Sequence, residues 1–329
     1  MSTLIDRHGR IHTDLRVSLT DRCSLRCTYC MPEQGMDWIP RADTLQTDEL
    51  LRLVAVAVDQ GVTTVRLTGG EPLLRPDVVD IVRAITALPG SPEVALTTNG
   101  LRLPGLAAPL VDAGLSRVNI SLDTMDRDRF LALTRRDRLI DTLAGIAAAK
   151  AAGLDPVKIN SVLMRGINDD EAPTLLLWAL EQGLHLRFIE QMPLDPQHSW
   201  DAGQMVTADE IQERLVAAGF ALTPLDDRGA APAELFHVNG GPQTVGIIGS
   251  MTRPFCGDCN RVRLTSDGQW RNCLFGRDET DLRTPLRSGA SDHDLATLMR
   301  RDVAAKRRAH GTDDTGFVQP DRPMSAIGG

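Results

Sequence analysis

The chain has 329 residues, of which 42% are hydrophobic and 24% charged, and its formal net charge is -8. This composition excludes a disordered or collagen-like protein and is typical of a globular protein with a substantial core. The acidic excess lies within residues 1–252, which excludes the clustered basic face of a nucleic-acid-binding protein.

The sequence also indicates where the protein resides. No run reaches the roughly 18 uncharged apolar residues of a membrane helix, since the longest apolar stretch, residues 50–58, contains Arg52. The first ten residues are charged and lack the apolar segment of a secretory signal. We therefore expect a cytoplasmic protein. The one dense basic cluster, Lys306-Arg307-Arg308, is interpreted as a solvated helix end, where cations are favourable.

Strand and helix patterns alternate along the first 190 residues. Strands are predicted at residues 15–19, 64–67, 93–97, 117–122, 157–162 and 185–189. Helices are predicted at residues 47–60, 77–87, 106–113, 127–133 with 139–152, and 169–182. Gly61, Gly114, Gly153 and Gly183 follow four of these segments, as helix caps do. This α/β alternation predicts a parallel sheet forming an incomplete (βα)6 barrel of the TIM type.

The alternation ends after Glu190. We predict a helix at residues 208–218, a hairpin around Asn239-Gly240, and a second hairpin in which residues 261–265 and 269–272 flank Asp267-Gly268. The predicted organisation is a barrel over residues 1–225 and a C-terminal α+β extension over residues 226–329.

The second hairpin returns Cys273 towards Cys256 and Cys259. An ideal two-residue turn pairs Cys273 with Val262, on the face opposite to Arg261 and Arg263. A bulge or a longer loop would resolve this conflict.

Six cysteines form two triads, Cys23, Cys27 and Cys30, then Cys256, Cys259 and Cys273. Structural disulfides are rare in a cytosolic chain of this size, where clustered thiols more often bind metal. The first triad follows the first strand, at the carboxyl end where parallel α/β proteins build their sites. Three thiolates leave one corner of a four-iron cluster open for an external ligand. The alternative is a zinc site completed by His8 or His12.

Two further features accompany the first triad. Tyr29 lies inside it, and Thr68-Gly-Gly-Glu-Pro72 follows the second strand, where paired glycines let backbone approach a ligand or form a simple turn. The cysteine spacing together with this segment resembles the radical S-adenosylmethionine (SAM) superfamily. That resemblance implies a [4Fe-4S] cluster whose open iron binds SAM and whose electron yields a 5'-deoxyadenosyl radical.

The second triad narrows the resemblance. Phe255-Cys-Gly-Asp-Cys-Asn-Arg-Val-Arg-Leu264, Cys273-Leu-Phe275 and the terminal Gly328-Gly329 are similar to the GTP 3',8-cyclase family of molybdenum-cofactor biosynthesis. The similarity extends nearly end to end, with departures at Ser24 and at Gly249-Ser250. It implies a second [4Fe-4S] cluster whose open iron touches the guanine of GTP, removal of the 3' hydrogen of GTP by the radical, and closure of C3' onto C8.

The resemblance also implies site residues and partners. GTP contacts are implied at Arg16, Arg66, Thr97, Lys158, Arg261, Val262 and Arg263, and SAM contacts at Tyr29, Gly70, Ser121 and Met192. Arg263, Gly328 and Gly329 are implied to serve catalysis, with the glycine tail reaching the active site. The family further implies a homodimer, an unidentified electron donor, and transfer of the product to cyclic pyranopterin monophosphate synthase.

Physical chemistry supports a cationic site, because a buried triphosphate needs paired cations, although any single strand-end arginine is more often a surface ion pair. We expect the five cations to converge on one barrel mouth and the site to lie at the carboxyl rim. Two alternatives stay open. One is a radical SAM peptide-modifying enzyme with an auxiliary cluster, which usually carries more cysteines. The other is a non-enzymatic iron-sulfur or zinc sensor module, which leaves the cations unexplained.

Overall fold

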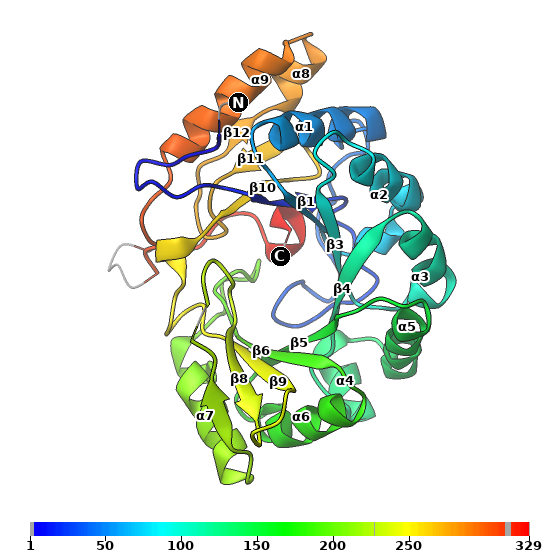
Figure 1. The fold of residues 1–329 in the computed structure, drawn as a ribbon, viewed down its shortest axis with the longest axis vertical. Coiled ribbons are helices and arrows are strands. Elements are labelled where there is room, and N and C mark those ends of the chain that lie inside the picture. The colour runs from blue at the N-terminus through cyan, green and yellow to red at the C-terminus, as the bar shows by residue number, and fades with distance from the viewer. Residues whose placement is uncertain (1–2, 227, 313–316, 329) are drawn as a thin grey trace.

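The computed structural model describes residues 3–226, 228–312 and 317–328 (Figure 1). Its centre is a curved sheet with six consecutive parallel strands. These are β1 (Asp14–Ser18), β2 (Thr64–Thr68), β3 (Glu93–Thr98), β4 (Leu115–Ser121), β5 (Val157–Leu163) and β6 (His185–Glu190). All six strands were predicted from the sequence to within two residues, and the predicted incomplete barrel is confirmed.

Helices cover the outer, convex side of this sheet (Figure 1). They are α1 (Thr47–Asp59), α2 (Val78–Thr86), α3 (Leu103–Asp112), α4 (Arg127–Thr134), α5 (Leu139–Ala151) and α6 (Ala172–Glu181). The predicted helix at residues 169–182 begins with a 3-10 turn, Asp169–Glu171, before α6. The four predicted capping glycines have positive φ angles, which confirms their place just beyond the helix ends.

The C-terminal region adds a strand to each edge of the six-stranded core. β9 (Thr244–Ile248) pairs in parallel with β6, and β10 (Arg261–Leu264) pairs in parallel with β1. Antiparallel strands then extend both edges. These are β8 (Glu234–Val238) and β7 (Leu222–Pro224) beyond β9, and β11 (Gln269–Arg271) and β12 (Thr280–Asp281) beyond β10. The region after residue 225 therefore widens the sheet itself, and a domain boundary at residue 225 stays a prediction.

A longer loop resolves the register conflict of the second hairpin. β10 and β11 pair Arg263 with Arg271, one residue away from the register of a two-residue turn. The loop has three residues, because Thr265 N donates to Gln269 O at 2.9 Å and Gly268 takes a φ of 81°, the left-handed conformation that glycine adopts without strain. Arg271 consequently shares a face with Arg263, and Cys273, two residues further, returns to the same side.

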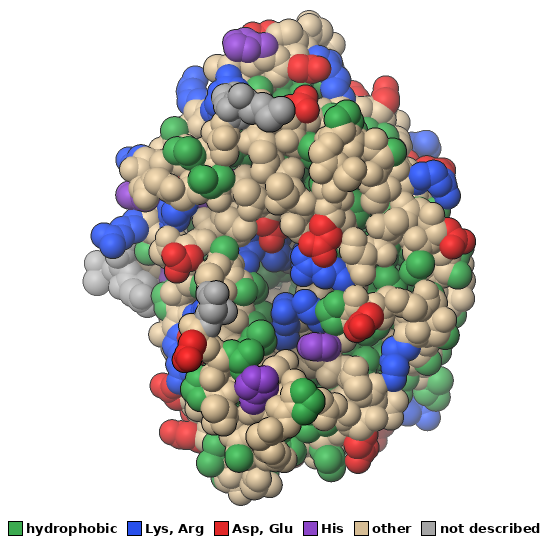
Figure 2. Space-filling view, viewed as in Figure 1, with side chains coloured by type: hydrophobic (Ala, Val, Ile, Leu, Met, Phe, Trp, Pro, Cys, Tyr) green, Lys and Arg blue, Asp and Glu red, His purple; other side chains and the backbone are tan. Residues whose placement is uncertain are grey.

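The inner face of the curved sheet is polar, because side chains alternate along each strand. On β1, Leu15 and Val17 are buried in the hydrophobic core beneath the helices, so Asp14, Arg16 and Ser18 face the concave side. Figure 2 shows Lys and Arg side chains gathered around a hollow in the middle of this face. The fold thus places a basic interior inside an acidic protein.

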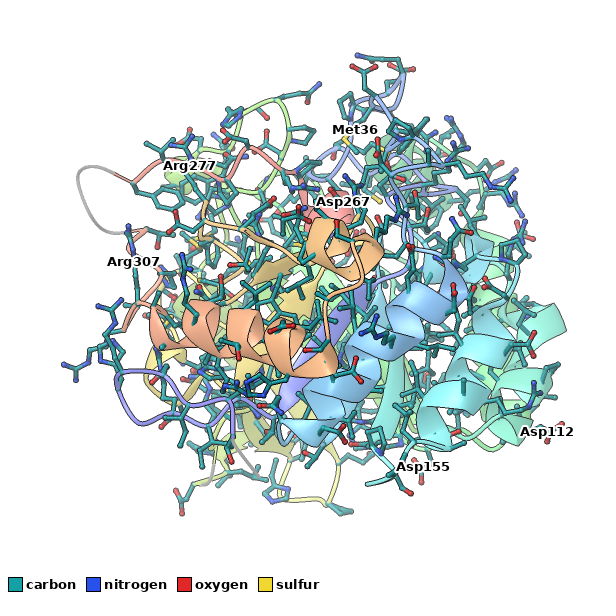
Figure 3. All side chains as sticks on the ribbon, turned by 90° about the horizontal axis from the view of Figure 1, so that it is seen from above. Met36, Asp112, Asp155, Asp267, Arg277 and Arg307 are labelled. Atoms are coloured by element: carbon teal, nitrogen blue, oxygen red, sulfur yellow. The ribbon has the colours of Figure 1, made fainter. Side chains whose placement is uncertain are left out.

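Four more helices complete the described structure: α7 (Ala208–Ala217), α8 (Arg283–Arg287), α9 (Asp292–Ala304) and α10 (Met324–Ile327). α9 packs beside α1 on the outside (Figure 3), and it begins at a reciprocal hydrogen-bonded cap between Ser291 and Asp294. The short α10 lies within the curve of the sheet (Figure 1).

Within the described ranges we find no helix with the length and apolar character that a bilayer crossing requires.

Candidate active site

A row of basic residues crosses the inner face of the sheet. The parallel register places Arg16 of β1 directly between Arg66 of β2 and Arg263 of β10. Lys158 on β5 and Arg187 on β6 continue the row on the far side. Arg16 and Arg66 lie in the middle of their strands, and Lys158 and Arg187 lie in the first half of theirs, so these cations line the barrel interior, whereas Ser121 and Met192 lie at the carboxyl ends.

The cations of this row form few ion pairs. Within the described residues no ion pair involves Arg16, Arg66, Lys158 or Arg187, whereas the nearby Arg117 pairs with Glu93 at 2.5 Å. Arg16 Nε and both Arg66 Nε and Nη1 are buried with no hydrogen-bond partner.

The environment of this row lowers the pKa of each cation. Desolvation, and then repulsion between neighbouring charges, lowers the pKa of Arg16 to about 10 and that of Arg66 to about 9. The same causes lower the pKa of Lys158 to about 8 and that of Arg187 to about 10. Asp14 is the carboxylate whose charge acts on Arg16 and Arg66, and among the described residues it forms no ion pair with either. Adjacent buried cations outnumber it and are unfavourable, so the row fits a polyanionic ligand.

Arg187 was not assigned a role from the sequence. Its signal was present, because on β6 Leu186 and Phe188 are buried in the core and the residue between them must face the concave side. Its alignment beside Asn160 of β5 depended on the sheet register, which the sequence does not display.

The first cysteine triad lies in the loop after β1. Cys27 O accepts hydrogen bonds from Cys30 N and Met31 N, both at 2.9 Å, and Arg26 N donates to Thr134 O at the end of α4. Arg135 Nη1 donates to Arg26 O at 3.2 Å and Met31 O at 2.9 Å. The loop is therefore held by α4, with all three thiols free of disulfides.

The chemistry of the first triad fits a bound cationic group. Desolvation, followed by nearby negative groups, raises the pKa of Cys23 to about 11 and that of Cys30 to about 12, and raises the pKa of Cys27 well above its ordinary value. Three adjacent buried thiolates require compensating positive charge, which iron supplies. Of the histidines of the zinc alternative, His8 is exposed, and both ring nitrogens of His12 face other groups, Nε2 at 3.2 Å from Asp6 Oδ2 and Nδ1 at 3.5 Å from Lys306 Nζ, which contacts the second triad.

Tyr29 anchors this loop to β4. Its hydroxyl donates to Asp123 Oδ2 at 2.7 Å, and Asp123 Oδ1 accepts from Val162 N at 2.8 Å. Burial raises the pKa of Asp123 to about 6, against the effect of both hydrogen bonds. Asp123 is a positioning residue that the sequence interpretation did not assign, although it ends the quoted Ser121-Leu-Asp segment.

Gly69 and Gly70 bring the loop after β2 against the first triad loop. A Cβ at either position would collide with the backbone of residues 20–22, and Gly70 N donates to Thr20 O at 2.7 Å. The adjacent Glu71 accepts from Leu73 N, Thr98 Oγ1 and Asn99 N at 2.8–2.9 Å. The glycine pair is thus required for close packing of two loops at the carboxyl ends of β1 and β2.

The remaining predicted ligand contacts lie in different parts of the barrel. Ser121 ends β4, and Met192 follows β6 by two residues; with Tyr29 and Gly70 they lie at the carboxyl ends of the strands. Thr97 faces the concave side, since Leu96 beside it is in the core. Val262 is fully buried in the core, so only its backbone is available to a ligand.

The second triad lines a cavity of about 70 Å³. Its walls include Cys256, Cys259 and Cys273 together with Arg261 and Arg263, so the structure brings together the residues that the two-residue register would have separated. Desolvation, and then the neighbouring thiolates, raises the pKa of Cys256 to about 11. Arg261 also stacks 4.6 Å from the ring centre of Phe255. The donors and cations fit an iron-sulfur cluster beside an anionic ligand.

The chain's C-terminal segment enters the same interior. Arg263 donates a hydrogen bond to Gly328 O, and Met324 N donates to Leu194 O at 3.3 Å. Gly328 has a φ of 84°, and a Cβ there would collide with Thr68 Oγ1. The predicted need for glycine at position 328 thus has a steric cause, whereas Gly329 lies outside the described residues.

The interpretation of residues 306–308 as a solvated helix end is wrong for Lys306. Its side chain is 3% exposed, and its Nζ donates to Arg261 O at 2.7 Å and to Cys259 Sγ at 3.5 Å. Burial alone would raise the pKa of Cys259, but the Lys306 and Arg261 charges lower it below its ordinary value.

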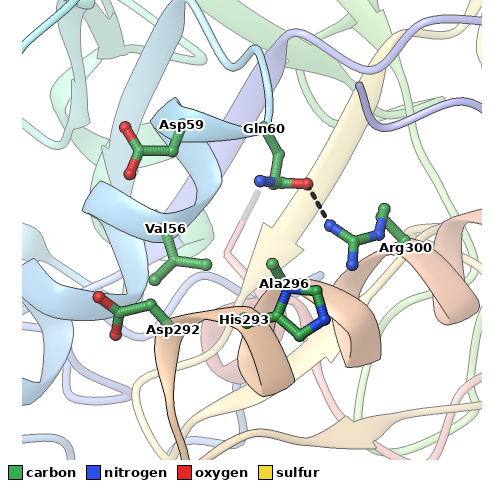
Figure 4. A pocket seen from close by; sticks show the side chains of 7 residues that line it. All are labelled: Val56, Asp59, Gln60, Asp292, His293, Ala296 and Arg300. Carbon is green, nitrogen blue, oxygen red and sulfur yellow. Dashed lines mark hydrogen bonds between the residues drawn. The ribbon is translucent and has the colours of Figure 1, made fainter. Parts of the chain in front are cut away.

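A larger pocket of about 450 Å³ lies elsewhere, between α1 and α9 (Figure 4). It is lined by Val56, Asp59, Gln60, Asp292, His293, Ala296 and Arg300. Gln60 Oε1 accepts from Arg300 Nη1 at 2.6 Å. None of the predicted site residues lines this pocket.

A barrel interior with an open three-cysteine loop after β1 defines the class of radical SAM proteins. Residues 17–179 match the family model described as the radical SAM superfamily, and residues 184–312 match Molybdenum Cofactor Synthesis C. The fold is similar to that of Streptococcus suis SuiB bound to S-adenosylmethionine, with a TM-score of 0.58 and 14% identity over 89% of this chain and 69% of that chain. This likeness concerns the fold alone.

Sequence relatives identify the family. The chain is 58% identical to the GTP 3',8-cyclase of Streptomyces coelicolor, covering 99% of this chain and 96% of that protein. It is 55% identical to the GTP 3',8-cyclase of Corynebacterium glutamicum, covering 99% and 89%. The chain belongs to the GTP 3',8-cyclase family, as the resemblance inferred from the sequence implied.

Proposed function

We propose that this chain converts GTP to (8S)-3',8-cyclo-7,8-dihydroguanosine 5'-triphosphate, the first step of molybdenum-cofactor biosynthesis, with SAM and two [4Fe-4S] clusters. The row of unpaired cations that runs from Arg263 through Arg16 and Arg66 to the far side of the barrel carries this proposal. Membership of the GTP 3',8-cyclase family supports it and disfavours the peptide-modifying and sensor alternatives.

The two ends of the barrel interior would bind different ligands. Cys23, Cys27 and Cys30 would hold the first cluster, and Tyr29, Gly70, Ser121 and Met192 would bind SAM at the carboxyl ends of the strands. SAM supplies, once bound and reduced, the radical that removes a hydrogen atom from the substrate. Asp123 and Glu71 keep the loops that carry these residues in place through the hydrogen bonds described above.

GTP would bind towards the amino ends of the same strands. Cys256, Cys259 and Cys273 would hold the second cluster next to the guanine. Contacts to GTP are proposed from Arg16, Arg66, Thr97, Lys158, Arg187, Arg261 and Arg263, and from the backbone of Val262. Cations fixed on strands hold the phosphates without reorganisation, and this fixes which ribose carbon points towards SAM.

Arg263 and the glycine tail close the space between the two sites. Arg263 has no ion pair among the described residues, and burial, followed by repulsion from Arg16, lowers its pKa to about 9. Its hydrogen bond to Gly328 O holds the tail beside Ser18 and Thr68. We propose that Arg263, Gly328 and Gly329 exclude water and steady the substrate while the C3'–C8 bond forms.

The remaining expectations concern the protein's surroundings. We propose that it acts in the cytoplasm as a homodimer, receives electrons from a separate donor, and passes its product to cyclic pyranopterin monophosphate synthase.

The proposed reaction is tested with 3'-deuterated GTP. The anaerobically reconstituted protein is mixed with reductant, SAM and the labelled GTP, and the mass of the 5'-deoxyadenosine formed is measured by mass spectrometry. Deuterium in 5'-deoxyadenosine is expected and establishes substrate and abstraction site together. Unlabelled 5'-deoxyadenosine would refute abstraction from the 3' position of GTP. No 5'-deoxyadenosine at all, with both clusters intact, would favour the sensor alternative.

A further inference from the structure

Lys306 is a buried cation directed at the second cysteine triad. It lies two residues beyond the end of α9, and no ion pair to a carboxylate involves it within the described residues. Besides Arg261 O and Cys259 Sγ, its Nζ lies 3.5 Å from His12 Nδ1. The thiol sulfur of Cys259 is therefore the anionic group to which this lysine donates once the thiol is deprotonated.

The N-terminal segment fixes the position of Lys306. Arg10 Nη2 donates to Arg307 O at 2.6 Å and Arg10 Nη1 donates to Arg308 O at 2.9 Å, while Asp6 holds the Arg10 guanidinium at 2.6 Å. Arg10 Nη1 also donates to Cys256 O. The same arginine thus ties the lysine segment to the backbone of a second cysteine of the triad.

The first triad has a different electrostatic setting. There the side-chain groups that act on cysteine sulfurs as donors are neutral: the amide of Asn99, at 3.9 Å from Cys23 Sγ, and the hydroxyl of Tyr29 beside Cys27. Besides desolvation, the buried carboxylates Glu71 and Asp123 raise the pKa of Cys23 and Cys27 respectively, while the charge of Arg26 lowers that of Cys23 without a hydrogen bond to its sulfur. A charged N–H donor to sulfur is therefore specific to the second triad among the described residues.

We propose that Lys306 is a positioning residue that raises the reduction potential of the second cluster by presenting its charge and an N–H donor to Cys259. Hydrogen bonds to cluster sulfurs and nearby charge are what set such potentials. An added electron makes a thiolate-bound cluster more negative, and a fixed cation stabilises that reduced form. This inference rests on the proposed function insofar as the second triad holds a cluster.

The test measures midpoint potentials in full-length protein. A background with Ser at the three first-triad positions reports the second cluster alone, and the converse background, with Ser at 256, 259 and 273, reports the first. Lys306→Met removes charge and donor at similar length, Lys306→Gln removes the charge and keeps an N–H donor, and Lys306→Arg keeps both. The matched control is Arg307→Met, because Arg307 is exposed and lies at the edge of the molecule (Figure 3).

EPR-monitored titration is expected to show a lower midpoint potential of the second cluster in Lys306→Met. The expected shift is tenfold or more in the ratio of reduced to oxidised cluster at a given potential, which is about 59 mV for one electron. Lys306→Gln should show a smaller shift and Lys306→Arg almost none. The first cluster and the Arg307→Met protein should keep their wild-type potentials.

Several results would overturn the inference. One is an unchanged second-cluster potential in both Lys306→Met and Lys306→Gln; another is an equal shift in Arg307→Met. If Lys306→Met loses its iron, the Gln variant decides by the same criterion. Failure of the proposed function gives a different result. If the protein with Ser at the three first-triad positions and an intact second triad binds no iron, the second cluster itself is refuted.

Discussion

The hydroxyl of Tyr29 donates a 2.7 Å hydrogen bond to the carboxylate of Asp123 across 94 residues of sequence. This contact joins the first cysteine loop, after β1, to the carboxyl end of β4. It places a titratable acid in the interior next to residues proposed to hold SAM and iron. The protonation of Asp123 has a measurable consequence for stability.

Asp123→Asn should change the pH dependence of stability in the cluster-free protein. The pKa of Asp123 is raised from 3.8 to about 6 when the chain folds, so the folded state binds the proton more tightly than the unfolded state. The stability that this group contributes is complete below about pH 4 and is lost as pH rises through 6. Relative to Asp123→Asn, the wild type should lose about 3 kcal/mol of unfolding free energy over that range. Denaturant unfolding at several pH values measures it, and a constant difference would contradict it.

Arg66→Met should stabilise the ligand-free fold while weakening GTP binding. Arg66 is buried beside Arg16 without a carboxylate partner, so its removal relieves repulsion and desolvation. We expect a small rise in Tm and a roughly 10- to 100-fold larger Kd for GTP, as the loss of a charged hydrogen bond implies. Arg83→Met, at an exposed ion pair with Asp80, is the control and should change neither. Unaltered GTP affinity in Arg66→Met would remove Arg66 from the site.

Gly328→Ala should reduce turnover about tenfold or more with little change in Tm. The added methyl collides with Thr68 Oγ1, so the tail must leave the interior and its contact with Arg263. The matched control is Gly153→Ala, because Gly153 has a similar φ of 83° but open space around its Cβ position. That variant should lose about 1 kcal/mol of stability through backbone strain and keep its turnover. Full activity of Gly328→Ala would contradict a functional tail, as would full activity of a protein tagged at its C-terminus.

Cys273→Ser and Cys23→Ser should separate the two halves of the reaction. Cys273→Ser is expected to lose the iron of the second cluster and to bind GTP weakly, while keeping the first cluster. Cys23→Ser should retain the second cluster and GTP binding but lose SAM cleavage. Iron analysis, EPR and GTP binding by calorimetry distinguish the two variants, and GTP binding that survives in Cys273→Ser would separate the guanine site from the second triad.

The order of strands β1 to β6 was predictable because each strand and its following helix are local patterns with their own periodicity and caps. The places of β9 and β10 were not, since β9 pairs with β6 across 59 residues of sequence and β10 pairs with β1 across 247. Arg187 and Lys306 were missed for a related reason. Arg187 is aligned with Asn160 and Lys306 contacts Cys259, and both of these neighbours come from distant segments of the sequence.

By itself the sequence determined the six-strand alternation, the two cysteine triads and the family, because these depend on residue types and short spacings. Only the tertiary structure decided which charges lie together. The sheet register placed Arg263, Arg16 and Arg66 side by side, a three-residue loop returned Cys273 to their face, and the packing of α9 buried Lys306 against Cys259. Register and burial are set by the packing of the whole chain, where a shift of one residue reverses every side chain of a strand.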